Sequence, residues 1–258
     1  MLASQRRDNI YKLIKENGQA SVSYLSEVFS VSEVTIRQDL ITLEEMDLIK
    51  REYGGAVLKD VDVYSRTLSL ANTSHMPEKQ AIAKEAFKLV KRNDTIILDS
   101  GSTVTELAKL LVEVSGITVI TNALNIALIL GVNPGINLIV TGGEFKAPTL
   151  SLTGEKAAQF FNGLHADKLF LATAGMAIKS GLTYPSLSDI CVKKAMIESS
   201  ATTYLLADSS KLEQSSFAKL GDLSLVDVLI TDSHMDSEKE RLLVSNGVKY
   251  IKAKPLKI

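Results

Sequence analysis

Apolar residues recur at helical spacing in three short stretches near the start of the chain. The apolar positions are Ile10, Leu13 and Ile14, then Leu25, Val28 and Phe29, and then Ile36, Leu40 and Leu43. Gly18 follows the first stretch, while Ser21 and Ser32 precede the second and third, where serine favours the start of a helix. The pattern therefore predicts three helices before residue 48, the first over residues 6–16.

Residues 48–57 form two short extended segments around a glycine pair, Gly54 and Gly55, and this pattern predicts a β-hairpin. Three helices followed by a hairpin make a winged helix-turn-helix, which we expect over residues 1–59. Periodicity is then lost over residues 60–77, where Asp, Ser, Thr and Asn gather. We interpret that segment as a linker to a second domain over residues 78–258.

Seven apolar runs in the second domain alternate with helical segments. The runs are residues 95–98, 118–121, 137–140, 168–172, 203–206, 226–231 and 249–251. This alternation predicts an α/β domain with a mostly parallel sheet and helices on both faces. Ligands in such domains bind at the carboxyl ends of the strands, so the candidate chemistry is expected there.

Composition adds limits on function. The formal net charge of −1 gives no general attraction for nucleic acid, so any DNA contact must depend on where charges lie. The single cysteine, Cys191, excludes an intramolecular disulfide, and the three scattered histidines suggest no metal site. The first residues lead into charges without the apolar core of a signal peptide, and no apolar stretch is long enough to span a membrane. We therefore expect a cytoplasmic protein.

A helix-turn-helix reads DNA with the start of its second helix. If Ile36 and Leu40 face the core, their neighbours face outward and carry groups that bind base edges or phosphates. The candidate DNA-binding residues, hairpin included, are Ser32, Glu33, Val34, Thr35, Arg37, Gln38, Lys50, Arg51, Tyr53 and Gly54. Glu44 lies at the far end of the helix, where its charge need not repel DNA. The alternative is an ordinary solvated helix and turn.

Residues 99–103, Asp-Ser-Gly-Ser-Thr, join the first predicted strand of the second domain to a helix. Small residues let backbone N–H groups converge, and the helix N-terminus adds partial positive charge, so the loop favours a phosphate or similar anion. An ordinary strand-to-helix turn is the alternative. Asp189 and Lys193 share a helix face at four-residue spacing, and could bind a sugar hydroxyl and a phosphate or form an exposed ion pair.

The N-terminal residues resemble the helix-turn-helix of the DeoR family of transcriptional regulators. The resemblance lies in Arg6, Ile10, Ile14, in residues 32–40 (Ser-Glu-Val-Thr-Ile-Arg-Gln-Asp-Leu) and in the wing, residues 51–56 (Arg-Glu-Tyr-Gly-Gly-Ala). Gln38, Tyr53 and Ser30 depart from the residues more frequent in the family, and these departures concern the operator sequence more than the activity.

The second domain resembles the DeoR-family sensor domain from residue 78 to residue 232. The resemblance implies a fold similar to ribose-5-phosphate isomerase, no cofactor, and a phosphorylated sugar that releases a repressor of a carbohydrate-utilisation operon from DNA. The pocket residues that it implies are Asp99, Ser100, Gly101, Ser102, Thr103, Asn122, Gly142, Gly143, Lys168, Asp189, Lys193, Asp208 and Lys211. Many members of the family carry an acidic residue at the position of Ala174, and Glu is frequent at the position of Asp189. The identity of the sugar therefore stays open.

Two other functions compete with this one. A sugar-phosphate isomerase would use Asp189 or Asp208 as general base, but its N-terminal domain would have no role. A dinucleotide-dependent oxidoreductase would need glycines that the loop at residues 99–103 lacks. For a repressor, one short helix contacts too few base pairs for specific binding, so we expect a homodimer or homotetramer on double-stranded operator DNA.

Overall fold

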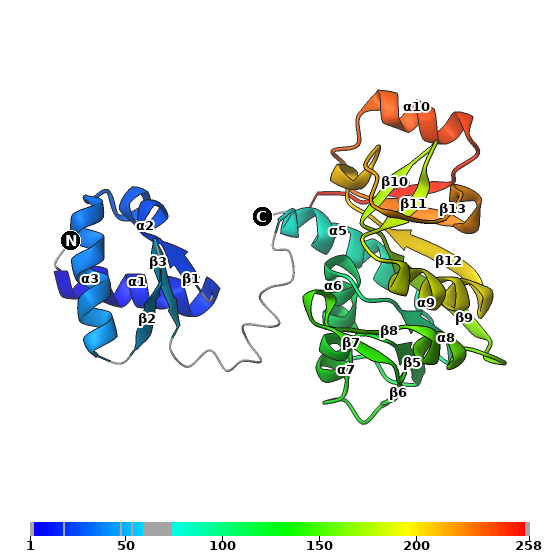
Figure 1. The fold of residues 1–258 in the computed structure, drawn as a ribbon, viewed down its shortest axis with the longest axis horizontal. Coiled ribbons are helices and arrows are strands. Elements are labelled where there is room, and N and C mark those ends of the chain that lie inside the picture. The colour runs from blue at the N-terminus through cyan, green and yellow to red at the C-terminus, as the bar shows by residue number, and fades with distance from the viewer. Residues whose placement is uncertain (1–2, 18, 47, 53, 59–73, 256–258) are drawn as a thin grey trace. The chain divides into compact units, whose positions relative to one another are not determined.

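The computed structural model describes residues 3–17, 19–46, 48–52, 54–58 and 74–255 (Figure 1). The chain divides into two compact units, residues 1–70 and 71–258, and each is described by itself. Residues 60–73 of the expected linker, together with Gly18 and Tyr53, lie outside the described residues. The last part of the expected linker is helical, because Met76 and Pro77 begin helix α5.

The first unit contains the predicted helices and hairpin. Its elements are α1 (Ala3–Asn17), β1 (Gln19–Ser21), α2 (Val22–Phe29), α3 (Glu33–Glu45), β2 (Ile49–Glu52) and β3 (Gly55–Leu58). The three strands form an antiparallel sheet in the order β1-β3-β2, so the hairpin gains a third strand that the sequence did not indicate. Three helices and this small sheet confirm a winged helix-turn-helix.

Serine caps set where the second and third helices begin. The side-chain oxygens of Ser21 and Ser32 accept hydrogen bonds from the backbone N–H groups of Tyr24 and Thr35, each at 3.2 Å. The apolar faces of the helices meet in one core whose fully buried members are Ile10, Ile14, Leu25, Ile36, Leu40 and Ile49. Val28 does not join it and is 47% exposed, which corrects the predicted inner face of α2.

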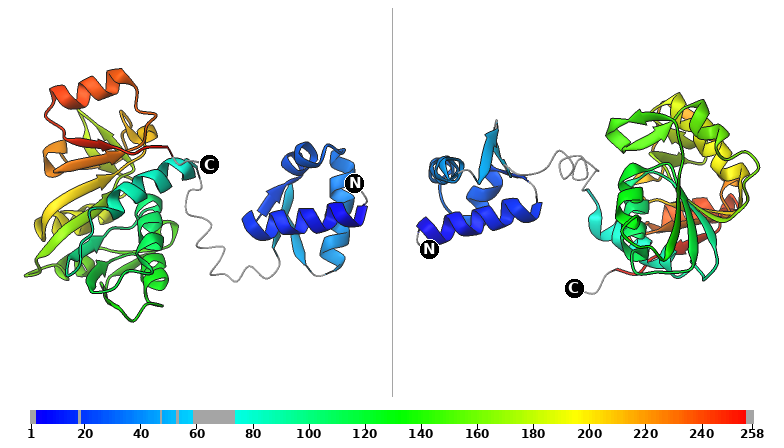
Figure 2. Two further views of the ribbon diagram at one scale, coloured as in Figure 1. Left: turned by 180° about the vertical axis from the view of Figure 1, so that it is seen from behind. Right: turned by 90° about the horizontal axis from the view of Figure 1, so that it is seen from below.

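The second unit is built on a parallel sheet of seven strands (Figure 1, Figure 2). In spatial order these strands are β15 (Tyr250–Lys252), β14 (Val228–Thr231), β12 (Ser200–Leu206), β9 (Ala166–Ala172), β4 (Thr95–Leu98), β5 (Ile117–Thr121) and β6 (Ile136–Val140). Every neighbouring pair in this sheet is parallel. All seven correspond to the predicted apolar runs, so the expected α/β architecture is confirmed.

Helices cover both faces of the sheet. They are α5 (Met76–Phe87), α6 (Ser102–Leu111) and α7 (Leu124–Leu130) on one face, and α8 (Glu155–Gln159), α9 (Leu187–Glu198) and α10 (Ser237–Ser245) on the other. Alternate residues of β4 serve the two cores: Ile96 and Leu98 pack with the first group, and Ile97 packs with the second. Burial on both faces explains why the strands read as continuous apolar runs.

Two small antiparallel sheets and three short 3-10 helices lie outside the predicted pattern. They are the hairpin β7 (Glu144–Lys146) and β8 (Ser151–Thr153), the sheet β10 (Gly175–Ala177), β11 (Gly181–Tyr184) and β13 (Ala218–Gly221), and the helices η1 (Ala147–Thr149), η2 (Ser209–Lys211) and η3 (Leu223–Leu225). Among the described residues, no helix is both long and apolar enough to cross a membrane.

Candidate functional site

The outer face of α3 carries the residues predicted to read DNA. Glu33, Val34, Arg37 and Gln38 are exposed, Val34 to 72%, while Thr35 is half-buried. The Nη2 of Arg37 donates to Oε2 of Glu33 at 2.6 Å, an exposed pair one helical turn apart. Because such surface pairs contribute little to stability, the Arg37 guanidinium can leave Glu33 for another partner at small cost.

A buried ion pair anchors α3 from its inner side. The Nε of Arg6 in α1 donates to Oδ2 of Asp39 at 2.6 Å, and its Nη2 donates to Oδ1 at 3.3 Å. The two side chains are only 13% and 7% exposed. The hydrogen bond that Arg6 donates to Asp39 raises the pKa of the Arg6 guanidinium. Sequence reasoning did not assign this pair a role.

The wing carries two exposed cations and a turn that contains a glycine of positive φ. Lys50 and Arg51 are exposed on β2, and Gly54 has a φ of +81°, which a residue with a side chain adopts only with strain. Arg51 is bound to Glu44: its Nε donates to Oε2 at 2.6 Å and its backbone N–H to Oε1 at 2.8 Å. These bonds hold the pKa of Glu44 below its usual value. Glu44, expected only to stay clear of DNA, thus fixes the wing to the end of α3.

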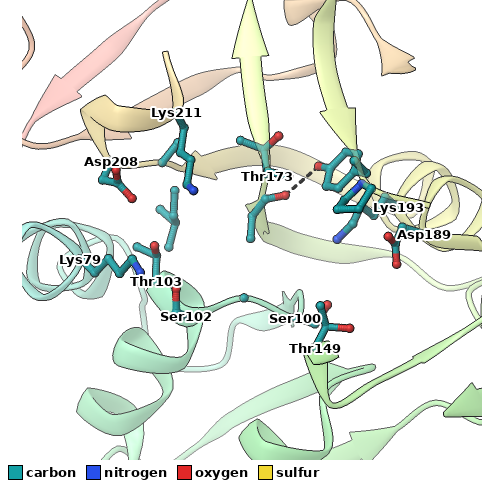
Figure 3. A pocket seen from close by; sticks show the side chains of 17 residues that line it. Lys79, Ser100, Ser102, Thr103, Thr149, Thr173, Asp189, Lys193, Asp208 and Lys211 are labelled. Carbon is teal, nitrogen blue, oxygen red and sulfur yellow. Dashed lines mark hydrogen bonds between the residues drawn. The ribbon is translucent and has the colours of Figure 1, made fainter. Parts of the chain in front are cut away.

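In the second unit, a cavity of about 230 Å³ opens at the carboxyl ends of β4, β9 and β12 (Figure 3). Its lining residues are Lys79, Ser100, Gly101, Ser102, Thr103, Thr149, Ala172, Thr173, Ala174, Tyr184, Pro185, Asp189, Lys193, Leu206, Ala207, Asp208 and Lys211. Residues 100–103 of the predicted loop therefore form one wall. The volume is of the order of a small metabolite.

The loop enters the cavity by passing very close to β9. A Cβ built on Gly101 would lie 2.5 Å from the Cβ of Ala172, so only glycine fits there without displacing the strand. Gly101 precedes the first residue of α6, whose opening N–H groups have no partner within the helix. Because Ser102 and Thr103 line the cavity at this point, the positive end of α6 faces its interior.

Asp189 and Lys193 do not pair with each other. Lys193 donates to both carboxylate oxygens of Asp99, at 2.7 and 2.6 Å, while Asp189 accepts from Lys146 of β7 at 2.6 Å. Both Asp189 and Lys193 are buried, which corrects the exposed ion pair kept open above. Lys193 also lies 4.7 Å from the ring centroid of Tyr184. Each charge at this end of the cavity is thus matched by an opposite charge.

Tyr184 lines the cavity beside Lys193 and is a neutral hydrogen-bond donor. Burial raises the pKa of its hydroxyl well above the ordinary value, because the phenolate would lose its hydration, and the charge of Asp99 raises it further. The hydroxyl donates to the carbonyl of Ala172 at 2.7 Å. The bond ties β11 to the end of β9, beside the loop that holds Gly101.

The opposite side of the cavity gathers Lys79, Lys211 and Asp208 near Ser102 and Thr103 (Figure 3). Lys79 is only 2% exposed. Burial lowers its pKa because the charged form loses hydration; the carboxylates of Asp208 and Glu106 raise that pKa, and the charge of Lys211 lowers it. Asp208 accepts from the N–H and hydroxyl of Ser210 in η2.

Five of the residues implied for the pocket are not among its lining residues: Asp99, Asn122, Gly142, Gly143 and Lys168. Asn122 donates to the carbonyl of Leu152 at 3.0 Å and so supports β8. Lys168 donates to Asp94 at 2.6 Å, at the start of β4 rather than at its carboxyl end. Asp99 contributes through Lys193 and does not itself line the cavity.

Sequence reasoning missed Lys79, Thr149, Thr173 and Tyr184 as lining residues. One signal could have found Lys79: it occupies the helical stripe that continues with Ile82, Ala83 and Ala86, all buried. A lysine on an apolar stripe indicates either a buried partner or a ligand. In the part of the chain that the structure describes, no three His, Cys, Asp or Glu side chains gather as a metal site would require.

Comparison with known families matches both halves of the chain. Residues 6–61 match the DeoR-like helix-turn-helix domain, and residues 74–233 match the DeoR C terminal sensor domain.

Curated relatives match over nearly their full length. The HTH-type transcriptional regulator GolR of Listeria innocua is 36% identical over 236 residues, which cover 92% of this chain and 93% of the relative. The glycerol-3-phosphate regulon repressor of Escherichia coli is 32% identical over 233 residues, 90% of this chain and 92% of the relative.

Among solved structures, ribose 5-phosphate isomerase A from Methanocaldococcus jannaschii is similar over 52% of this chain and 53% of its own, with 19% identity and a TM-score of 0.39.

Proposed function

The chain belongs to the DeoR family of transcriptional regulators, and from that premise we propose a repressor of a carbohydrate-utilisation operon that a phosphorylated sugar releases from DNA. Helix α3 and the wing bind the operator, and the cavity of the second unit binds the sugar. The observation that supports the binding of a phosphorylated sugar is the cavity of the second unit, where the N-terminus of α6 and two lysines converge. A phosphate is the group that such a convergence binds best.

The side chains on the outer face of α3 supply the chemistry for base reading. Arg37 can donate two hydrogen bonds to guanine, Gln38 can pair with adenine, and Val34 can contact a thymine methyl group. Lys50 and Arg51 lie on the wing, where cations bind phosphates and set the register of the helix on the duplex. The Glu44–Arg51 pair keeps the wing and the helix in one orientation.

We expect a variant with a blocked loop at residues 100–103 to bind the operator but no longer to be released from it by a sugar phosphate. In the variant Ser102→Glu with Thr103→Glu, two carboxylates fill the wall of the cavity and repel a phosphate, so sugar phosphates should no longer bind or release the operator. The measurements are calorimetric titration with a panel of sugar phosphates, and operator retention with and without each sugar. The single variant Ser102→Glu, at a half-buried position, repeats the test should the double variant unfold.

Ser237→Glu is the matched control, because Ser237 is the exposed first residue of α10 as Ser102 is the first residue of α6. It should respond like the parent. In the parent, operator DNA must weaken sugar binding by the same factor as sugar weakens DNA binding, a coupling of about 1 to 3 kcal/mol. A blocked variant that still releases DNA fully would place the effector elsewhere.

A further inference from the structure

Helix α3 carries more negative than positive charge, although its outer face is the candidate DNA-reading surface. Its side chains include one cation and four carboxylates, namely Arg37 and Glu33, Asp39, Glu44 and Glu45. Arg6 binds Asp39 on the inner side of the helix, and Arg51 binds Glu44 at its far end. Glu33 lies at the opposite end, which a helix-turn-helix brings closest to the base edges.

Glu33 is bound to the one cation of this helix. The Nη2 of Arg37 donates to Oε2 of Glu33 at 2.6 Å, and the two side chains are 55% and 46% exposed. This hydrogen bond uses one N–H of the guanidinium. The other N–H groups can still form the pair of bonds with which an arginine reads guanine. Arg37 can therefore bind a guanine while Glu33 remains beside it.

A phosphate and a guanine edge present different charges to Arg37 and Glu33. Phosphates are negative and occur along the whole duplex whatever its sequence, whereas N7 and O6 of guanine are neutral acceptors. A phosphate that approaches Arg37 also approaches the Glu33 carboxylate, and the two negative charges repel each other. Opening the pair does not remove this repulsion, because Glu33 stays one helical turn from Arg37. A guanine edge meets no such repulsion.

We propose that Glu33 is a positioning residue that determines specificity, because its carboxylate disfavours phosphate binding by Arg37 and leaves Arg37 available to guanine. The inference rests on the proposed function, with α3 docked on DNA, and adds a role for Glu33 that needs no base contact of its own. An acidic residue in the first turn also stabilises a helix through the helix dipole. Stabilisation alone does not change the ratio of specific to non-specific affinity.

The experiment measures the affinity of the full chain for two duplexes. The specific duplex is the sequence that the parent enriches from a random pool, and the non-specific duplex has the same length and composition in scrambled order. Glu33→Gln removes the charge and keeps the size of the side chain. We expect it to bind the non-specific duplex about tenfold more tightly and the specific duplex within about threefold of the parent.

The salt dependence gives a second readout for the same variant. In Glu33→Gln, Arg37 gains a phosphate contact on the non-specific duplex. The slope of log affinity against log salt concentration should therefore steepen by about one for that duplex. On the specific duplex, where Arg37 binds guanine, the slope should stay that of the parent.

Glu45→Gln is the matched control, since Glu45 is an exposed carboxylate at the last residue of the same helix. It removes the same charge far from Arg37 and should leave the affinity ratio unchanged. A double-mutant cycle adds the second control. In an Arg37→Ala background, Glu33→Gln should also leave the ratio unchanged, because the carboxylate acts through Arg37.

Three results would overturn the inference and leave the proposed function standing. The first is a parent-like ratio in Glu33→Gln, and the second is an equal change of the ratio in Glu45→Gln or in the Arg37→Ala background. The third is a loss of affinity for the specific duplex alone, which would assign Glu33 a base contact. A parent that enriches no sequence from the pool would overturn the proposed function as well.

Discussion

Asp39 and Lys79 are charged residues at positions where helical periodicity calls for an apolar one. Asp39 is 5% exposed and Lys79 is 2% exposed, and both lie one turn from fully buried apolar residues of their own helices. Burial of a charge is unfavourable unless another charge or a ligand compensates it. Arg6 compensates Asp39, and this explains a charged residue on the inner side of α3.

Substitution on the two sides of α3 should therefore have two different effects. Arg37→Ala should weaken specific operator binding by about 1 to 3 kcal/mol, the value of one guanine contact, and leave stability unchanged. Asp39→Ala should lower the free energy of unfolding of the first unit by about 2 kcal/mol or more, because the buried Arg6 loses its partner. Footprinting and denaturant unfolding measure the two effects. An Arg37→Ala protein that protects the operator as well as the parent would contradict the proposed docking.

The helices and strands that could be predicted from the sequence are those that one local signal determines. Ser21 and Ser32 are the N-caps of α2 and α3 and indicate where these helices begin. The seven strands of the main sheet are apolar because helices cover both faces of the sheet. The hairpin β7–β8 and the sheet of β10, β11 and β13 were missed, since their short strands are not the apolar runs that indicate a strand buried on both faces. The partners of one of these pairs are also far apart in the sequence: Thr183 of β11 pairs with Lys219 of β13.

The candidate site was predicted in part for the same reason. The loop at residues 99–103 was identifiable because a strand runs directly into a helix there. Lys79 and Tyr184 reach the cavity only through the packing of α5 and β11, which no local pattern encodes. Asn122 and Gly142 follow strands β5 and β6, on the side of the sheet away from β12, so a position after a strand did not suffice to place them in the cavity.

The contact between Gly101 and Ala172 yields a prediction about the loop as an element. Gly101→Ala should lower the free energy of unfolding of the second unit by about 1 to 3 kcal/mol and weaken sugar-phosphate binding, because the new methyl group must displace β9 or the start of α6. Adding Ala172→Gly should restore both properties, since it removes the atom that the new Cβ meets. Thermal unfolding and titration of the two variants measure this; the absence of rescue would show that the contact is not the cause.

For the whole molecule, we expect at least a dimer at the concentrations where operator DNA is bound. The thirteen residues of α3 span too few base pairs for operator specificity, and paired half-sites supply the remainder. Sedimentation with and without operator DNA measures the assembly. A chain that sediments only as a monomer in both conditions would contradict the expectation, and single-site binding to half of a palindromic operator would do so independently.

Strand β4 lies in the interior of the seven-stranded sheet although it is the first of those strands to leave the ribosome. Its neighbour β9 begins only at Ala166 and the edge strand β15 ends at Lys252, whereas the sheet of the first unit is complete at Leu58. At a translation rate of about 5 to 20 residues per second, roughly 10 to 40 s pass between the synthesis of Leu58 and that of Lys252. During synthesis, each nascent chain therefore contains the complete helix-turn-helix unit before the seven-stranded sheet of the second unit has been synthesised.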